Sequence, residues 1–206
     1  IDIVFNCTNY DETYIMGYCN SFVKIGIDKE FNYFGIRFLP GIFPSLFNID
    51  ASELSNHYER LNTVQPCIYN VIQQSKDRCL CLQDLCDELN IYFIKHINKI
   101  DKPFDNRFFC ALETILKSKG SIIIEKDLND GISSRHLQRL FNFYIGDTAK
   151  SFCRIVRFQN LLKIDPSVKL IKSEKSYYDF GYYDQTHFIK EFKLFYGKTP
   201  LKIAAE

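Results

Sequence analysis

The chain has 206 residues, enough for one domain with a sizeable core or for two small ones. No run of apolar residues approaches the roughly 18 that span a bilayer, so the composition argues against a membrane protein. Residues 1–94 carry 6 Lys and Arg against 12 Asp and Glu, a net charge of −6, whereas residues 95–206 carry 20 against 13, a net charge of +7. A basic half joined to an acidic half indicates that the C-terminal half meets a polyanion.

Cysteine usage bears on the compartment. The eight cysteines show no disulfide-framework spacing, and no signal peptide is visible. We therefore expect reduced thiols and a cytoplasmic protein. Because the chain begins at Ile1 and its only methionine is Met16, we also expect that its natural start precedes Ile1.

The acidic half begins with three short segments rich in β-branched and aromatic residues, each bounded by turn formers. They predict strands over residues 1–6, 22–27 and 33–38. Arg37 lies in the third segment, where an arginine among apolar residues is a candidate to bind a carboxylate or phosphate of a ligand. The alternative is an internal ion pair with Glu53 or Glu59.

A cysteine cluster follows, with the spacing Cys79-x-Cys81-x4-Cys86. It lacks the paired CxxC spacing of zinc sites. The apolar residues around it recur at helical spacing and form a core face: Leu82, Leu85, Cys86 and Leu89. We therefore predict core cysteines, with no metal and no cofactor.

The basic half reads as a series of helices. Apolar residues at helical spacing predict a helix over residues 105–117, and a short helix over residues 125–130 leads to a turn at Gly131. Ser133 or Ser134 then caps a helix that runs through Phe141. A long helix over residues 149–164 follows.

A second unit of the same kind ends the chain. Gly181 can take the positive φ of a tight turn, and Asp184 can accept hydrogen bonds from the amides that open a helix. Three phenylalanines then recur at helical spacing: Phe188, Phe192 and Phe195. Gly197 stops this helix, and Pro200 can start the next one.

The two units are an internal repeat. A shift of 51 residues pairs positions of similar type: Leu137 with Phe188, Arg139 with Lys190, Phe141 with Phe192, Gly146 with Gly197 and Thr148 with Thr199. Gly131 pairs with Gly181 when one residue is gained or lost between them. Two similar units in tandem predict two helix-turn-helix modules.

Over residues 181–200 the chain resembles the AraC/XylS family of transcription regulators. The elements that carry the resemblance are Gly181-Tyr182, Asp184, Thr186, Phe188, Lys190, Phe192-Lys193 and Gly197-Lys198-Thr199-Pro200. Residues 1–60, with the motif Gly35-x-Arg37-Phe38-x-Pro40-Gly41, resemble the N-terminal domain of one subgroup of these regulators. The resemblance implies a DNA-binding protein whose N-terminal domain senses an effector or forms dimers.

These observations predict an α+β protein with two domains. Residues 1–94 are expected to form a small mixed β/α domain of the sensor or dimerisation type, and residues 95–104 a linker. Residues 105–206 are expected to form an all-α domain of about seven helices with two helix-turn-helix modules. The long helix would join the modules and let both recognition helices enter successive major grooves on one face of DNA.

The predicted DNA-binding residues have side chains that suit base edges or phosphates, since Arg pairs with guanine, Gln with adenine, and Lys or Arg with phosphates. From the first module and the long helix they are Ser134, Arg135, His136, Gln138, Arg139 and Lys150. From the second module they are Tyr183, Gln185, Thr186, His187, Lys190 and Lys193. Lys150, Lys190 and Lys193 are expected nearer the phosphates.

Three function classes remain open. The first is a sequence-specific regulator whose partners are double-stranded DNA and, by resemblance, RNA polymerase, an effector or a second copy of the chain. The second is a regulator that acts through protein contacts with weak or no DNA binding, because Asp127 and Tyr177 stand where helix-turn-helix units usually carry a small residue. The third is an enzyme, against which no phosphate-binding glycine loop, G-x-S-x-G or H-E-x-x-H motif is found.

Overall fold

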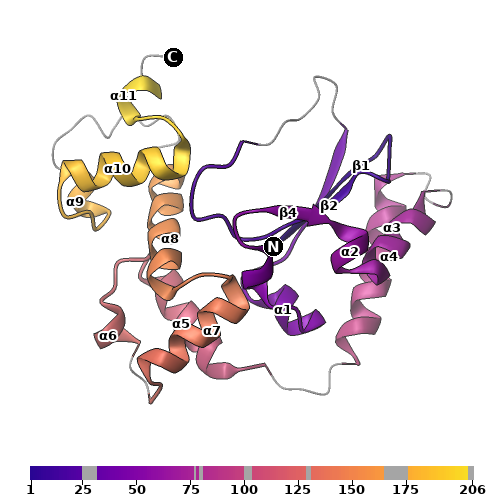
Figure 1. Ribbon diagram of the computed structural model, residues 1–206, viewed down its shortest axis with the longest axis horizontal. Helices are drawn as coiled ribbons and strands as arrows, with labels where there is room; N and C mark the ends of the chain where they lie inside the picture. Colours follow the sequence, from indigo (N-terminus) through magenta and orange to yellow (C-terminus); the bar gives the residue numbers. More distant parts are fainter. Residues whose placement is uncertain are drawn as a thin grey trace. The chain divides into compact units, whose positions relative to one another are not determined.

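The computed structural model describes residues 1–24, 32–76, 78, 81–99, 104–128, 131–164 and 176–203. The chain divides into two units, the first of residues 1–18, 25–104 and 143–146 and the second of residues 19–24, 105–142 and 147–206. The first unit contains an antiparallel sheet with helices, and the second is helical (Figure 1). The predicted α+β class is therefore confirmed.

The sheet of the first unit has its strands in the order β3-β1-β2-β4, all antiparallel. They are β1 (Asp2–Asn6), β2 (Thr13–Met16), β3 (Tyr33–Arg37) and β4 (Tyr58–Arg60). Ile3 of β1 lies opposite Ile15 of β2 and Ile36 of β3. Ile3, Phe5 and Ile15 are fully buried, because alternate residues of a strand point to the same face of a sheet.

Two of the three predicted strands are observed. β1 and β3 fall within residues 1–6 and 33–38. The strand predicted over residues 22–27 is wrong at residues 22–24, which are not in a strand, and residues 25–27 lie outside the described residues. β2 and β4 were not predicted, since such short segments become strands through hydrogen bonds to distant neighbours rather than through a local pattern.

Helices cover the buried face of this sheet. They are α1 (Ile42–Phe47), the 3₁₀ helix η1 (Ala51–Leu54), α2 (Leu61–Val64), α3 (Pro66–Ser75) and α4 (Leu82–Ile97). Ile68 and Ile72 of α3 pack with Leu85 and Leu89 of α4 in one core with the buried strand residues. Each such side chain stabilises the fold by roughly 1.5–3 kcal/mol relative to an exposed one.

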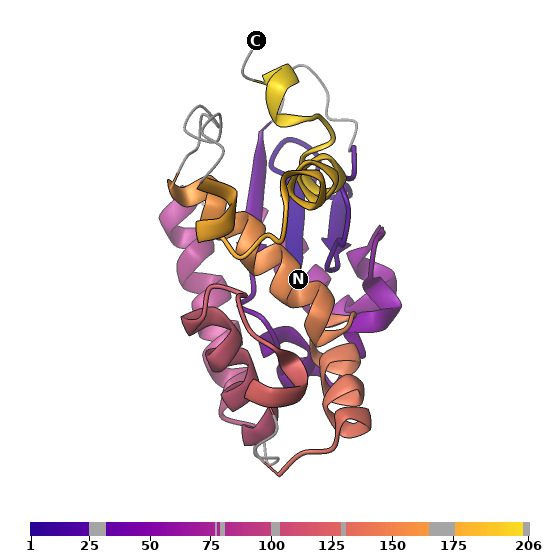
Figure 2. The same cartoon turned by 90° about the vertical axis from the view of Figure 1, so that its left-hand side faces the viewer.

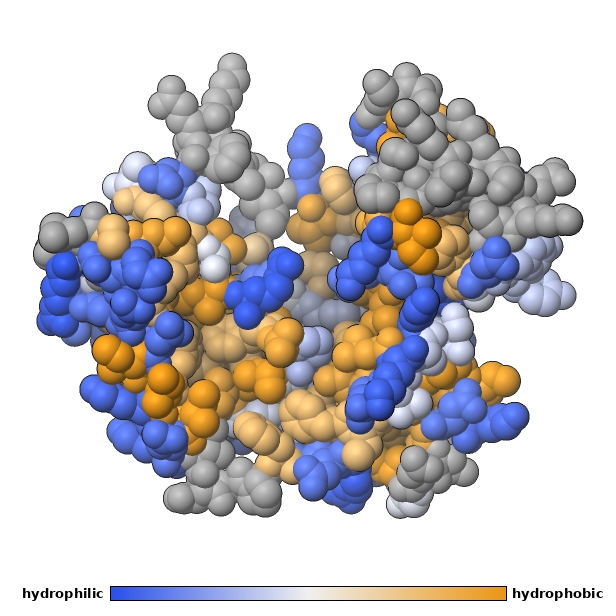
Figure 3. Space-filling model, turned by 180° about the vertical axis from the view of Figure 1, so that it is seen from behind, coloured by the Kyte–Doolittle hydropathy of each residue, from blue (hydrophilic) through white to orange (hydrophobic). Residues whose placement is uncertain are grey.

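The surface of α4 corrects one prediction. Leu85 and Leu89 are buried and Cys86 is half-buried, but Leu82, the first residue of the helix, is 61% exposed and lies outside the core. Cys81 is exposed as well, so it is not a core cysteine, and Cys79 lies outside the described residues. Hydrophobic residues are visible among hydrophilic ones at the surface of this unit in Figure 3.

Seven helices lie in the second unit among its described residues. They are α5 (Asn106–Lys117), α6 (Ile124–Asp127), α7 (Ser134–Ile145), α8 (Ala149–Ile164), α9 (Ser176–Asp179), α10 (Gln185–Tyr196) and α11 (Pro200–Ile203), although the last three residues of α7 are grouped with the first unit. α5, α7, α8 and α10 agree with the predicted helices. α6 covers residues 124–127 rather than 125–130, of which residues 129–130 lie outside the described residues.

The internal repeat is a repeat of structure. α7 and α10 have 12 residues each, and their first residues, Ser134 and Gln185, are separated by the same 51 positions as the sequence repeat. The turn glycines before them, Gly131 and Gly181, have φ of 72° and 76°. The glycines after them, Gly146 and Gly197, have φ of 94° and 85°. A residue other than glycine rarely adopts this conformation, which explains why both units keep both glycines.

The first turns of α7 and α10 are capped at equivalent positions. The backbone N–H of His136 donates to Ser133 Oγ (3.3 Å), and the backbone N–H of His187 donates to Asp184 Oδ1 (2.7 Å). Each cap satisfies an amide that has no carbonyl partner within the helix. The recognition helices of both modules, α7 and α10, therefore begin with a side-chain cap at the same position, formed by a serine in one and an aspartate in the other.

α8 runs between the two modules and packs against the core of each (Figures 1 and 2). In the first module, Phe141 packs between Phe108 of α5 and Phe152 of α8, with ring centroids 5.2 and 6.1 Å apart. In the second, Phe158 and Leu161 of α8 are buried with Tyr177, Tyr182, Phe188 and Phe192. Because opposite ends of one helix complete both cores, the modules cannot separate without exposing apolar surface.

Candidate DNA-binding site

The outer face of α7 presents the polar side chains predicted for the first module. Ser134, Arg135, Gln138 and Arg139 are exposed, while Leu137 and Phe141 are buried beneath them. The side chains of Arg135, Gln138 and Arg139 make no hydrogen bond or ion pair with other described residues. Their donors and acceptors are therefore free to meet base edges or phosphates.

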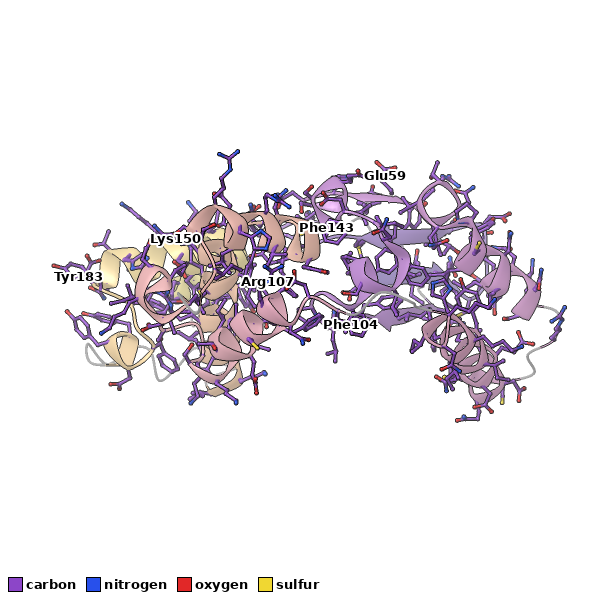
Figure 4. All side chains as sticks on the ribbon, turned by 90° about the horizontal axis from the view of Figure 1, so that it is seen from below. Glu59, Phe104, Arg107, Phe143, Lys150 and Tyr183 are labelled. Atoms are coloured by element: carbon purple, nitrogen blue, oxygen red, sulfur yellow. The ribbon has the colours of Figure 1, made fainter. Side chains whose placement is uncertain are left out.

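The outer face of α10 repeats this arrangement. Gln185, Thr186, Lys190 and Lys193 are exposed, and Phe188 and Phe192 pack inward. The turn before the helix carries Tyr183, which is 85% exposed and lies at the outer end of the helical unit in Figure 4. The helix therefore separates an apolar buried face from a polar outer face, as a helix that enters a DNA groove requires.

The two histidines of the predicted set differ from the rest. His136 is half-buried, and its Nε2 atom is buried without a hydrogen-bond partner among the described residues. His187 is also half-buried, and its Nε2 lies 3.2 Å from Glu191 Oε2. Both are the third residue of their helix, so their side chains turn toward the body of the module rather than outward.

Lys150 lies on neither helix. It is the second residue of α8 and is exposed, as the labelled side chain in Figure 4 shows. No acidic partner is present for it among the described residues. The structure thus brings Lys150 to the segment that joins the modules, apart from the two outer helix faces.

One arginine ties the two modules together. Arg157 of α8 donates from Nη1 to the carbonyl oxygen of Gly181 (3.1 Å) and from Nη2 to that of Gly120 (3.4 Å). Gly181 belongs to the turn of the second module and Gly120 follows α5 of the first. The guanidinium also lies over the ring of Tyr182, 5.3 Å from its centroid, a cation–π contact that helps to fix its plane.

Close packing at this junction requires glycine. A Cβ atom on Gly120 would lie 2.2 Å from the carbonyl oxygen of Cys153, and Gly120 has a φ of 76°. A Cβ atom on Gly181 would lie 2.5 Å from Ser121 Oγ. The backbone at Gly120 therefore approaches the backbone of α8 directly, and the side chain of Ser121 approaches the turn of the second module.

A buried carboxylate links α10 to α8. The side chain of Glu191 is 1% exposed, and its Oε2 accepts from Arg154 Nε (3.1 Å) and lies near His187 Nε2. Its Oε1 is buried without a hydrogen-bond partner among the described residues. A buried carboxylate is costly unless it is paired, so Arg154 stabilises α10 against α8.

Two neighbouring groups are held in their neutral forms. Burial, aided by the charge of Glu191, raises the pKa of the Tyr182 hydroxyl far above its usual range. Burial also raises the pKa of the Cys153 thiol to about 11. Neither group ionises near neutral pH, so neither adds a negative charge beside Arg154, Arg157 and Glu191.

Arg37 in the first unit has a partner that the sequence did not suggest. Its Nη2 lies 2.8 Å from Asp2 Oδ2, and Nε also donates to the same carboxylate. The alternative of an ion pair with an acid of the chain is therefore observed, but the acid is Asp2 rather than Glu53 or Glu59, because β1 and β3 pair in a register that sets Asp2 opposite Arg37. The Arg37 side chain is 82% exposed, so this ion pair lies at the surface.

Sequence reasoning missed the residues that hold the modules together. Arg154 and Arg157 lie in the predicted long helix but were given no contact there, and Glu191 was not singled out. A signal was present, since Glu191 lies three positions after Phe188 and therefore on the apolar side of α10. An acidic residue at a buried helical position predicts a cationic partner.

Two further classes of site were considered in the described part of the chain. No group of three His, Cys, Asp or Glu side chains there is placed to hold a metal ion. None of the helices there combines the length and apolar character needed to cross a membrane.

Two family models match parts of the chain. A family model described as a helix-turn-helix domain matches residues 130–205, and one described as a domain of unknown function (DUF6597) matches residues 1–60. No curated protein and no solved structure matches the chain. The helix-turn-helix match spans α7, α8 and α10 and points to a regulator rather than to an enzyme. The chain thus carries an AraC-type helix-turn-helix domain behind a DUF6597 domain, which supports a DNA-binding transcription regulator and is consistent with the AraC family.

Proposed function

We propose that this regulator reads a specific DNA sequence by placing α7 and α10 in two successive major grooves. The observation that carries the proposal is the equivalence of the two helices. They have the same length, cap position and flanking glycines, and each turns unpaired polar side chains outward. Successive major grooves on one face of B-DNA lie about 34 Å apart, a separation that a single joining helix can set.

The outer residues are assigned by their chemistry. Arg135 and Arg139 suit the O6 and N7 acceptors of guanine, and Gln138 and Gln185 suit the N6 and N7 atoms of adenine. Lys190 and Lys193 are placed at phosphates, which position the protein without reading sequence. Ser134, Thr186 and Tyr183 complete the contacts at the helix starts.

The rest of the chain is assigned a regulatory role. We propose that residues 1–94 form a sensor or dimerisation domain, that residues 95–104 link it to the DNA-binding domain, and that residues 105–206 bind DNA. A small-molecule or protein effector, a second copy of the chain and RNA polymerase are the partners this arrangement suits. Arg37 serves a ligand only if that ligand displaces Asp2.

The proposal is tested by alanine substitution in the full chain. The probe is the DNA fragment that the protein retains most tightly from a random-sequence pool, at physiological salt. Arg139→Ala and Gln185→Ala should each weaken binding by about 1–3 kcal/mol and relax the base preference at one position. Gln159→Ala is the matched control, since Gln159 is exposed on α8 but lies outside the predicted contacts.

Two outcomes would count against the proposal in different ways. Unchanged affinity for both variants would show that the assigned faces do not read bases. No binding to any DNA, even at low salt, would favour the second candidate, a protein that acts through protein contacts, which the buried Tyr177 in place of a small residue first suggested.

A further inference from the structure

A pocket opens between the two modules. It has a volume of about 360 Å³, which is room for on the order of ten water molecules. Its walls come from Ile122, Ile123, Ile124 and Glu125 at α6, from α8 and from His187 at the start of α10. α8 contributes Lys150, Cys153, Arg154 and Arg157. Both modules and the helix that joins them therefore line one hollow.

The lining carries more positive than negative charge. The charge of Arg154 is met by Glu191, but the two other cations that α8 contributes to the lining, Lys150 and Arg157, have no carboxylate partner among the described residues. Lys150 is exposed and unpaired, and Arg157 donates to two carbonyl oxygens while its Nε atom remains buried without a partner. Glu125 is the opposing carboxylate in the wall. The balance favours an anion, and Glu125 limits how strongly the anion is held.

We propose that this pocket binds a phosphate of the DNA backbone, at the point where the duplex passes from one recognised major groove to the next. The inference rests on the proposed function. Between two successive major grooves on one face, DNA presents its minor groove and the phosphates that border it. In the proposed complex the pocket between the modules lies against those phosphates, and Lys150 and Arg157 supply the positive charge. Sequence specificity still comes from α7 and α10.

The phosphate site also fixes where the duplex lies relative to the two recognition helices. Arg157 is already fixed by Gly120, Gly181 and the ring of Tyr182, so it meets the phosphate without first losing side-chain freedom. A phosphate held there fixes the position of the duplex along its axis relative to both recognition helices. This contact is made with any base sequence, so it contributes equally to specific and non-specific binding.

The test combines the removal of one phosphate charge from the DNA with the removal of the Lys150 charge from the protein. In the selected DNA fragment, each phosphate between the two recognised segments is replaced in turn by an uncharged methylphosphonate. The wild-type protein should lose about fourfold in affinity at 0.2 M salt for at least one central position. Lys150→Gln should bind unmodified DNA about fourfold more weakly and show no further loss at that position. Its slope of log K against log salt should fall by about 0.9.

Two matched variants serve as controls. Lys163→Gln makes the same change at an exposed lysine of α8 that does not line the pocket, and it should leave the effect of the central methylphosphonate intact. Glu125→Gln removes the opposing carboxylate and should strengthen binding to mixed-sequence DNA. Both lysines and Glu125 are exposed, so thermal unfolding should be unchanged.

The outcomes separate this inference from the proposed function. DNA binding that withstands Arg139→Ala and Gln185→Ala overturns the proposed function. A second outcome overturns the phosphate site alone. In that outcome Arg139→Ala and Gln185→Ala weaken binding, but the loss of affinity from Lys150→Gln simply adds to the loss from every central methylphosphonate. If 1 mM inorganic phosphate raises the Tm of the DNA-free protein above that in chloride of equal ionic strength, and Lys150→Gln abolishes the rise, the pocket holds a free anion and the backbone assignment is wrong.

Discussion

Two capping residues show how little local chemistry the modules must share. Ser133 and Asp184 occupy equivalent positions, and each accepts a hydrogen bond from the amide three residues later. We expect Ser133→Ala and Asp184→Ala each to lower the free energy of unfolding by about 1 kcal/mol in urea titrations. Asp179→Ala, at an exposed acidic residue of α9 that does not cap α10, should have no effect of this size. Equal values for all three variants would contradict the assignment of the caps.

The Cys153 thiol should be chemically inert in the folded protein. It is buried, and its pKa is about 11. At pH 8, well below this pKa, the thiol stays protonated and almost no reactive thiolate is present. Iodoacetamide at pH 8 should therefore modify the exposed Cys67, Cys81 and Cys110 well before Cys153, as followed by peptide mass spectrometry. In urea all of them should react at similar rates. Early labelling of Cys153 without denaturant would contradict the packing of α8.

At the scale of elements, the junction between α5, α8 and the turn at Gly181 requires a residue without a side chain at position 120. Gly120→Ala places a methyl group against the carbonyl oxygen of Cys153 and forces a positive φ on alanine. We expect a loss of at least about 3 kcal/mol in the free energy of unfolding. Gly131→Ala is the matched control, because Gly131 has a similar φ but open space around its Cα, and it should cost only about 1 kcal/mol.

The contact between α10 and α8 includes a buried ion pair, from which one charge cannot be removed alone without a loss of stability. Glu191→Ala leaves the partly buried Arg154 without its carboxylate, and we expect a loss of about 2 kcal/mol in the free energy of unfolding. Glu113→Ala, which breaks the exposed pair with Lys117, should cost less than about 0.5 kcal/mol. The double variant Glu191→Leu with Arg154→Met should recover most of the loss, since it removes both charges together. A cost for Glu191→Ala no larger than that for Glu113→Ala would contradict this role.

The sequence predicted elements well where local signals are strong. Asp184, the three phenylalanines and Gly197 define α10 from start to end, and the structure agrees. It predicted poorly where distant contacts decide, as at β2, which becomes a strand by pairing with β1 and β4. For the same reason the candidate site was predicted only in part. Exposed residues such as Arg139 follow from helical periodicity, whereas the bridge from Arg157 to two carbonyl oxygens requires the backbone positions of two distant turns.

At the scale of the whole molecule, the helical unit should measure distance along DNA. Shared α8 packing and the Arg157 bridge fix one module relative to the other. Inserting 5 base pairs between the two recognised segments rotates one by half a turn, and we expect affinity to fall by about a hundredfold. Inserting a full turn of 10 base pairs restores the face but not the distance, so binding should remain weak. Recovery at 10 base pairs would show that the modules move independently.

The equivalence of α7 and α10 has a consequence for orientation. The two helices share their length and caps but not their outer residues, since Arg135, Gln138 and Arg139 on one correspond to Thr186, Ile189 and Lys190 on the other. A site read by both helices of one chain is therefore not a palindrome, and the protein binds it in one defined orientation. If both helices read DNA as proposed, reversing such a site reverses the order in which the two modules meet the promoter, so a single bound chain would distinguish upstream from downstream.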